Sequence, residues 1–197
     1  MMPVSRYEIY GKIKVGAIAG IAGGFALLVS FFGIDASLNL PPGSFYMMIG
    51  LAVGLHGIVA TIFGGMVHML TATAIGAGFC VCSSLHPWLH IRSVWKGIFA
   101  GGVTGLEVYA IFFMPITLYI MIPTIDAAAN NSAFTAHELV MVTVLKSHMT
   151  MIIWGALVLH VTYGAVMGFF TGLMIHGGHR KNPKSLRDLE SESMPAT

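Results

Sequence analysis

The stretch FYMMIGLAVGLHGIVATIFGGMVHMLTATAIGAGFCVC, residues 45–82, contains no Asp, Glu, Lys or Arg. As one α-helix it would be about 57 Å long, nearly twice the roughly 30 Å hydrocarbon thickness of a bilayer. Because no polar turn divides it into two spans, we predict one long or broken membrane helix that projects beyond the outer surface. Its projecting end, residues 45–48, is apolar. We therefore expect Phe45, Tyr46, Met47 and Met48 to lie in the membrane interface or to pack on another protein.

Three other apolar stretches are long enough to cross a bilayer. They run from Val15 to about Phe32, from Gly97 to about Ile122, and from about His148 to His176. Only 9% of all residues are charged and 56% are hydrophobic, whereas a soluble domain carries roughly 25% charged residues. The sequence therefore predicts an all-α, polytopic protein with four transmembrane helices.

The Lys and Arg residues predict the orientation of these helices. With four spans, one side holds Arg6, Lys12, Lys14, Arg92, Lys96, Arg180, Lys181, Lys184 and Arg187, and the other side holds Lys146. Because cytoplasmic loops are rich in Lys and Arg, both termini are predicted to be cytoplasmic in a multi-pass protein of the cell membrane. The predicted parts are a cytoplasmic segment (1–14), a first two-helix repeat (15–82), a cytoplasmic loop (83–96), a second two-helix repeat (97–178) and a polar, disordered cytoplasmic tail (179–197).

The two predicted two-helix units resemble each other in sequence. Adding 81 takes Gly16, Gly20 and Gly24 to Gly97, Gly101 and Gly105, and adding 92 takes His56 and His68 to His148 and His160. We interpret this as a duplication of a two-helix unit. Since each unit crosses twice, the two copies are expected to be parallel and related by an axis along the membrane normal.

Glycines at intervals of four form stripes along the predicted helices. The stripes are Gly16, Gly20, Gly24; Gly97, Gly101, Gly105; and Gly164, Gly168, Gly172. Small residues on one face let two helix backbones approach closely in a membrane. We predict glycine-zipper packing within the chain, with docking to another subunit as the alternative.

Glu107 is a charged residue inside a predicted span, about 15 Å from the start of the helix at Gly97. A carboxylate at that depth costs several kcal/mol, so it is expected to face the bundle, a partner or water, or to be protonated. One interpretation is a proton relay or cation ligand, and the other is a neutral acid that serves assembly.

Histidines give the second candidate for chemistry. If the two copies face each other, His68 meets His160 and His56 meets His148, at two depths. Two imidazoles alone are too few for most metals, and Glu107 would add a carboxylate. The candidate metal site is thus His68, His160 and Glu107. A structural role for the histidines is the alternative, and copper or haem is the cofactor that such a site would take, although the sequence requires none.

No motif for nucleotide binding or hydrolysis occurs: G-x-x-x-x-G-K-[ST], G-x-S-x-G and H-E-x-x-H are all absent. We predict no catalytic residue and expect no catalysis by this chain alone. No basic stripe suits nucleic acid, so the expected partners are the lipid bilayer and other integral membrane subunits.

Three functions remain open from the sequence. The first is a non-catalytic integral subunit, with a structural or assembly role, of a larger membrane complex of the respiratory or monooxygenase-like kind. The second is a small transporter or channel for protons, metal ions or a small solute, and the third is a redox subunit that binds haem or copper.

Overall fold

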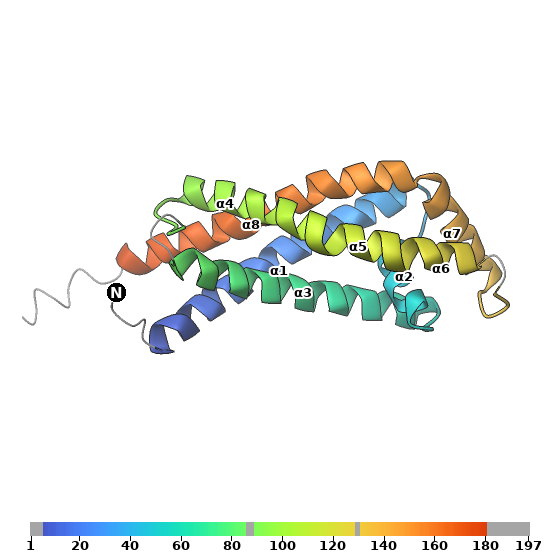
Figure 1. Ribbon diagram of the computed structural model, residues 1–197, viewed down its shortest axis with the longest axis horizontal. Helices are drawn as coiled ribbons and strands as arrows, with labels where there is room; N and C mark the ends of the chain where they lie inside the picture. Colours follow the sequence, from blue (N-terminus) through green and yellow to red (C-terminus); the bar gives the residue numbers. More distant parts are fainter. Residues whose placement is uncertain (1–5, 86–88, 129–130, 181–197) are drawn as a thin grey trace, which may run out of the picture.

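The computed structural model describes residues 6–85, 89–128 and 131–180, and within them all regular secondary structure is helical (Figure 1). Four helices are long and apolar enough to cross a membrane, as predicted for a multi-pass membrane protein. The predicted tail beyond residue 180 lies outside the described residues. The elements are α1 (Arg6–Ser37), α2 (Ser44–Ala52), α3 (Gly57–Leu85), α4 (Val94–Val108), η1 (Tyr109–Phe113), α5 (Met114–Ile116), η2 (Thr117–Met121), α6 (Ile122–Ala128), α7 (Ala136–Ser147) and α8 (Met149–Arg180).

The outer surface of the bundle is apolar. Each of the four long helices exposes large hydrophobic side chains, including Phe25 (58%), Leu70 (67%), Phe99 (76%) and Trp154 (65%). Contiguous apolar surface of this kind is rare on soluble monomers and suits contact with lipid. The hydrophobic effect thus favours insertion, and contacts between the helices must come from close packing and hydrogen bonds.

The long apolar stretch is a broken helix, because a turn separates α2 from α3. The Leu55 N–H donates to the Gly50 carbonyl and the Gly54 N–H donates to the Leu51 carbonyl. This pair of bonds is a Schellman motif, which requires a left-handed residue just after the helix. Gly54, with φ of 80°, supplies that conformation.

The predicted outward projection of residues 45–48 is wrong. After the break α3 runs back along α2, and a Cβ on Gly64 would overlap the Tyr46 carbonyl. Phe45, Tyr46, Met47 and Met48 are all buried within the chain itself. The absence of side chains at Gly50 and Gly64 lets α2 fold against α3, so its apolar residues enter the core.

Helices α4 to α6 form one continuous span, Val94–Ala128, that contains two wider π-helical turns. The Met114 N–H donates to the Tyr109 carbonyl and the Ile122 N–H donates to the Thr117 carbonyl, in each case five residues back. A proline follows each turn: Pro115 after η1 and Pro123 after η2. Proline lacks the N–H for an α-helical bond and its ring crowds the carbonyl four residues back, so the preceding turn widens.

The four long helices associate in two close pairs, α1 with α3 and α4 with α8. In the first pair, a Cβ on Gly16 would overlap the Gly76 carbonyl and a Cβ on Gly20 would overlap the Ala72 carbonyl. Only residues without bulky side chains permit such an approach.

The second pair has the same kind of contact. Cβ atoms on Gly97, Gly101 and Gly105 would overlap the carbonyls of Gly168, Gly164 and His160, in that order. Gly24 and Gly172 also lie at contacts, against Ala72 and Val94. Helices α1 and α8 pack on each other and join the two pairs.

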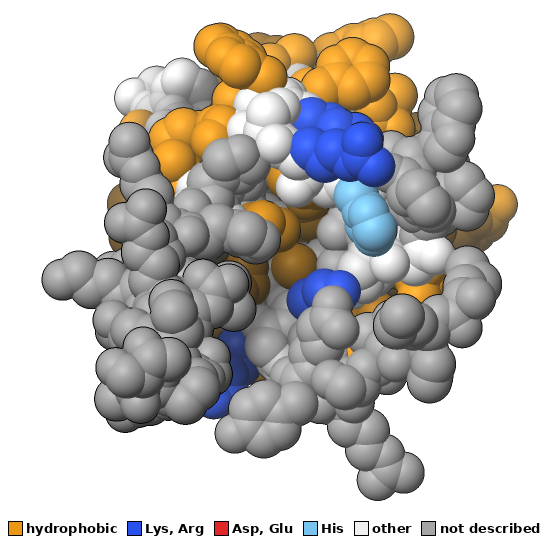
Figure 2. Space-filling view, turned by 90° about the vertical axis from the view of Figure 1, so that its left-hand side faces the viewer, with side chains coloured by type: hydrophobic (Ala, Val, Ile, Leu, Met, Phe, Trp, Pro, Cys, Tyr) orange, Lys and Arg blue, Asp and Glu red, His pale blue; other side chains and the backbone are white. Residues whose placement is uncertain are grey.

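The two ends of the bundle differ in charge. Helix α1 begins and α8 ends at one end, which we call the basic end (Figure 1). Viewed from that end, the described charged side chains in sight are Lys and Arg, with a His beside them (Figure 2). At the opposite loop end, the Lys146 ammonium pairs with the Asp126 carboxylate at 2.6 Å.

Helix α7 covers part of the loop end and was not predicted. It crosses this end between α6 and α8 (Figure 1). Thr135 and Glu138 form a capping box at its start. The sequence carries the corresponding signal, Thr-x-x-Glu before an apolar run, which is typical of a helix N-terminus.

Candidate functional site

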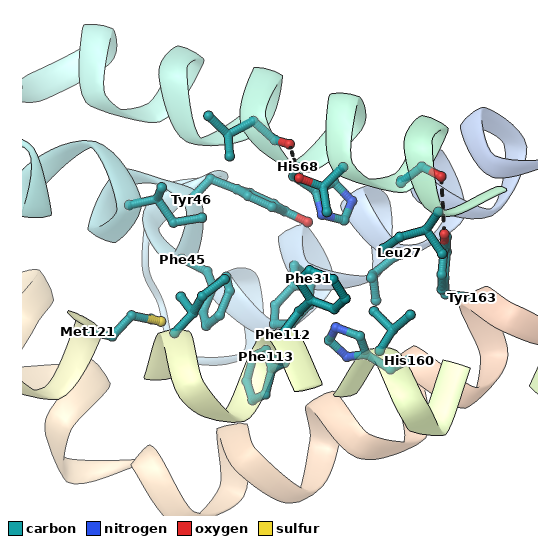
Figure 3. A pocket seen from close by; sticks show the side chains of 17 residues that line it. Leu27, Phe31, Phe45, Tyr46, His68, Phe112, Phe113, Met121, His160 and Tyr163 are labelled. Atoms are coloured by element: carbon teal, nitrogen blue, oxygen red, sulfur yellow. Dashed lines mark hydrogen bonds between the residues drawn. The ribbon is translucent and has the colours of Figure 1, made fainter. Parts of the chain in front are cut away.

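A cavity of about 100 Å³ lies in the middle of the bundle (Figure 3). Its wall takes residues from α1, α2, α3, the α4–α6 span and α8, so both helix pairs contribute to it. Most of the wall is apolar and aromatic. The lining includes Leu27, Phe31, Phe45, Tyr46, His68, Phe112, Phe113, Met121, His160 and Tyr163.

His68 faces this cavity from α3. Its Nε2 lies 3.0 Å from the Gly24 carbonyl oxygen of α1. Because a carbonyl only accepts, Nε2 is the donor, and in a neutral ring Nδ1 is then an acceptor. The ring packs against Tyr46, with 5.1 Å between the ring centroids.

His160 faces the same cavity from α8. Its Nδ1 donates to the Ala156 carbonyl of its own helix at 2.7 Å, which leaves Nε2 as the acceptor in a neutral ring. The aromatic rings of Tyr109 and Phe113 pack against the imidazole and fix its position. The two predicted partners, His68 and His160, therefore share one cavity.

Two tyrosines of the cavity wall differ in how their hydroxyls are satisfied. The Tyr163 hydroxyl donates to the Ala72 carbonyl at 3.2 Å. The Tyr46 hydroxyl is buried and has no hydrogen-bond partner within the described residues. An unpaired buried hydroxyl costs about 1–3 kcal/mol.

Glu107 does not join the histidines. Gly105 faces α8, and a residue two positions further along an α-helix is rotated by about 200°. The Glu107 side chain is accordingly exposed on the outer face of α4. Within the described parts of the chain, no three His, Cys, Asp or Glu side chains come together as a metal-binding group. The predicted set of His68, His160 and Glu107 is thus not assembled in the monomer.

The other predicted contact, His56 with His148, is not formed. His148 Nδ1 lies 2.9 Å from the Val144 carbonyl of the preceding turn. His56 Nδ1 lies 3.3 Å from both carboxylate oxygens of Glu138. Glu138, at the start of α7, rather than His148, which follows the end of α7, contacts His56.

Glu138 is the most highly connected side chain at the loop end. Its carboxylate accepts bonds from the Gly57 N–H (2.9 Å), the Thr135 N–H (2.8 Å) and the Thr135 hydroxyl (3.0 Å), besides its contact with His56. Only 2% of the side chain is exposed. Burial acts to raise the pKa of Glu138, but these bonds outweigh it and hold the pKa below its ordinary value.

Asp35 has a related role in the first half of the chain. It is fully buried, and its Oδ2 accepts a bond from the N–H of Gly43, the residue that precedes α2, at 2.8 Å. A carboxylate at a helix N-terminus is favoured by the helix dipole. Asp35 thus stabilises the start of α2 as Glu138 stabilises the start of α3.

Sequence reasoning missed both carboxylates and Tyr46. Glu138 carried the capping-box signal, whereas Asp35 and Tyr46 carried none, because their roles depend on the return of α2 into the bundle. Comparisons with protein-family models, with curated proteins and with solved structures find no match to this chain.

Proposed function

We propose that this chain is a non-catalytic integral subunit of a larger membrane complex, which it contacts through the outer face of α4. The observation that carries the proposal is the exposure of Glu107 on that face. Around it lie the exposed apolar side chains of Val103 (45%), Leu106 (48%) and Ile111 (64%). The face is thus an apolar surface with one carboxyl group in it.

The position of Glu107 in the span makes a partner energetically favourable. Glu107 is about 20 Å along the helix that begins at Val94, so it lies in the hydrocarbon region. No ion pair or hydrogen bond to its carboxylate occurs among the residues described. A charged side chain facing lipid at this depth costs about 2.5–3.5 kcal/mol on insertion scales. A neighbouring helix with an Arg, Lys or hydroxyl donor at the same depth would recover much of this cost.

The partner is proposed to be a different chain rather than a second copy. In a two-fold dimer through this face, Glu107 would oppose surfaces of the same composition, and two carboxyl groups would approach each other. The described basic side chains lie at the ends of the bundle, far from the depth of Glu107. A second copy therefore supplies no matching cation.

We further propose that the basic end is cytoplasmic. Lys12, Lys14, Arg92 and Lys96 lie there, whereas the basic residue of the described loop end, Lys146, is already paired with Asp126. The positive-inside rule assigns such an end to the cytoplasm.

The architecture is proposed to be a duplicated, parallel two-helix unit. Adding 92 takes the start of α2 (44) to the start of α7 (136) and the start of α3 (57) to the start of α8 (149). The same shifts convert contacts into contacts: Gly16 with Gly76 becomes Gly97 with Gly168, and Gly20 with Ala72 becomes Gly101 with Gly164. Matching helix starts and matching contacts support a duplication more strongly than matching glycines alone.

Site-specific crosslinking in the native membrane tests the proposed function. A photoactivatable benzophenone amino acid replaces Leu106, beside Glu107, in the full chain. The control replaces Leu70, which is 67% exposed on α3. We expect a covalent adduct with another integral membrane chain from position 106 and lipid adducts alone from position 70.

Glu107→Gln and Glu107→Leu sharpen the test. Gln keeps a hydrogen-bonding group and Leu removes it, so we expect the adduct at position 106 to persist in the first variant and to decline severalfold in the second. Lipid adducts alone at position 106, or an adduct only with a second copy, would contradict the proposal.

A second candidate function, the handling of a small solute within the membrane, is favoured by the central cavity. Two histidines from different helix pairs face it, as a solute site between two halves of a transporter would require. Reconstituted vesicles that show no solute or proton flux would count against this candidate and leave the subunit proposal unaffected.

A further inference from the structure

We propose that the central cavity is a binding site for a small neutral molecule from the bilayer that carries a hydroxyl group on an apolar body, of the phenol or alcohol class. The inference is independent of the proposed subunit role. It rests on the donors and acceptors of the cavity, its size and the apolar groove beside it.

The cavity presents acceptors that have no donor in the chain. His68 donates through Nε2 to Gly24, and His160 donates through Nδ1 to Ala156. The remaining ring nitrogens, Nδ1 of His68 and Nε2 of His160, have no hydrogen bond within the described residues. A neutral imidazole in this state accepts a bond from a hydroxyl group.

Tyr46 adds a group that both donates and accepts. Its hydroxyl is unpaired and its side chain is 2% exposed. Figure 3 shows the hydroxyl end of Tyr46 directed toward His68, at the same side of the cavity. A ligand hydroxyl in the cavity can donate to an imidazole, and a small rotation of the buried Tyr46 side chain would let it also accept from the phenol.

The rest of the wall selects an apolar body. Phe31, Phe45, Phe112 and Phe113 line the cavity on one side of the two imidazoles (Figure 3). A volume of about 100 Å³ is somewhat smaller than the engineered cavity of ~150 Å³ in another protein that binds benzene. The ligand can therefore be no larger than one small ring or a short chain, and a haem group is much too large.

A second hollow adjoins the cavity. An apolar groove between α2 and the η2–α6 segment shares Ile49, Val67 and Ile116 with the cavity wall. Its outer rim includes Tyr119, which is 78% exposed on the surface that faces lipid. A molecule dissolved in the bilayer would reach the cavity from this groove if the three shared side chains moved aside, without crossing water.

The test uses purified protein in lipid nanodiscs and two probes of nearly equal size, 4-fluorophenol and fluorobenzene. Fluorine NMR measures saturable binding above the signal of empty nanodiscs. We expect saturable binding of 4-fluorophenol and at least tenfold weaker binding of fluorobenzene. In the same sample, the ¹⁵N signals of the unprotonated imidazole nitrogens should shift when 4-fluorophenol is added.

The variants keep the structural bond of each histidine and replace its ring-nitrogen acceptor by an amide oxygen at a different position. His68→Gln retains a donor for Gly24 and His160→Asn retains a donor for Ala156, while Tyr46→Phe removes only the unpaired hydroxyl. We expect each to weaken 4-fluorophenol binding about tenfold. Tyr163→Phe is the matched control, because its hydroxyl lies in the same wall but is already bonded to Ala72, and it should leave binding within about twofold.

Equal binding of both probes, saturable binding that none of the three variants weakens, or no saturable binding of either probe would overturn the proposal. The ¹⁵N measurement needs no variant, so an unchanged imidazole signal during saturation overturns it even if a variant fails to fold.

Discussion

The α1–α3 pair and the α4–α8 pair have the same contact surface and differ in nearly everything else. Along both, glycine and alanine bring the helix backbones into contact at corresponding heights. Away from this surface, helix α2 packs against the α1–α3 pair. The α4–α8 pair instead has Glu107 on α4 and the two π-helical turns in the continuation of α4. The contact surface holds each pair together. The two pairs differ on their other faces, which contact the other pair, lipid or a partner.

The two cavity histidines, His68 and His160, form different hydrogen bonds. His68 donates across its pair, from α3 to the Gly24 carbonyl of α1. His160 donates instead to Ala156 within α8. In the second pair a Cβ on Gly105 would overlap the His160 carbonyl, so the backbones meet at the histidine itself and the ring bonds within its own helix. The His68 side chain thus links two helices by a hydrogen bond, whereas the His160 side chain bonds within its own helix and lines the cavity.

The largest expected effect is on the contact surfaces. Gly101→Leu and Gly20→Leu each force a side chain into an opposing backbone, which cannot move aside as a flexible side chain can. We expect each to destabilise the bundle by about 3 kcal/mol, at the upper end of overpacking effects. Unfolding by SDS titration in mixed micelles measures this.

Gly65→Ala is the control for the glycine substitutions, because no atom lies within 4 Å of a Cβ built at Gly65. It should be neutral or stabilise by about 0.5–1 kcal/mol through helix propensity. Overpacking costs typically span a range of about 2 kcal/mol. If the losses of stability in Gly101→Leu and Gly20→Leu differ by more than this, the two contact surfaces are not equivalent.

The next effect concerns the two buried carboxylates at the loop end. Glu138→Ala leaves the N–H groups of Gly57 and Thr135 without their acceptor, so we expect a loss of about 2–3 kcal/mol. Asp35→Ala should destabilise the chain less, because the Oδ1 atom of Asp35 has no hydrogen bond to lose. The same SDS titration ranks the two, and a larger loss for Asp35→Ala would reverse the comparison.

Glu138 also makes stability depend on pH. Its pKa is lower in the folded chain than in the unfolded chain, where it is near 4.5. The stabilisation is therefore complete above about pH 4.5 and declines as the pH falls toward the lowered folded pKa. Thermal unfolding in nanodiscs should show a midpoint that is lower at pH 4 than at pH 6, and Glu138→Gln should reduce this difference. An equal difference in both proteins would exclude Glu138 as its source.

A smaller effect separates the two histidines. His68→Phe removes a bond between helices and should destabilise the chain by about 1 kcal/mol. His160→Asn keeps the bond within α8 and should be close to neutral. Equal losses in the SDS titration would mean that the two histidines are structurally alike.

The smallest effect is expected at the Lys146–Asp126 pair. Both side chains are more than half exposed, at 63% and 54%. Lys146→Met should change stability by less than about 1 kcal/mol at the exposed loop end. A loss as large as that of Glu138→Ala would show that the loop end is held by its surface charges rather than by the buried carboxylate.

Much of the fold was predictable because long apolar segments and glycine spacing are local properties of the sequence. The four spans follow from them, and His68 and His160, which were paired through the internal similarity, both line one cavity. The outward orientation of the Glu107 side chain could have been predicted. Gly105 lies on the packed face of the helix, and a residue two positions later is rotated from it by about 200°. The burial of residues 45–48 could not be predicted, because it depends on the close packing of α2 against α3 at Gly50 and Gly64. The partners of Asp35 and Glu138 likewise lie on helices that only the folded chain brings near.

Accessibility of single cysteines tests most directly that two helix pairs cross the bilayer in the same sense. In a chain with Cys80→Ala and Cys82→Ala, the positions are Ser37→Cys at the end of α1, Arg92→Cys between α3 and α4, and Ser132→Cys before α7. In intact cells, a membrane-impermeant maleimide should label positions 37 and 132 and reach position 92 only after permeabilisation. Labelling of position 92 together with either of the others in intact cells would contradict the four-span, parallel arrangement.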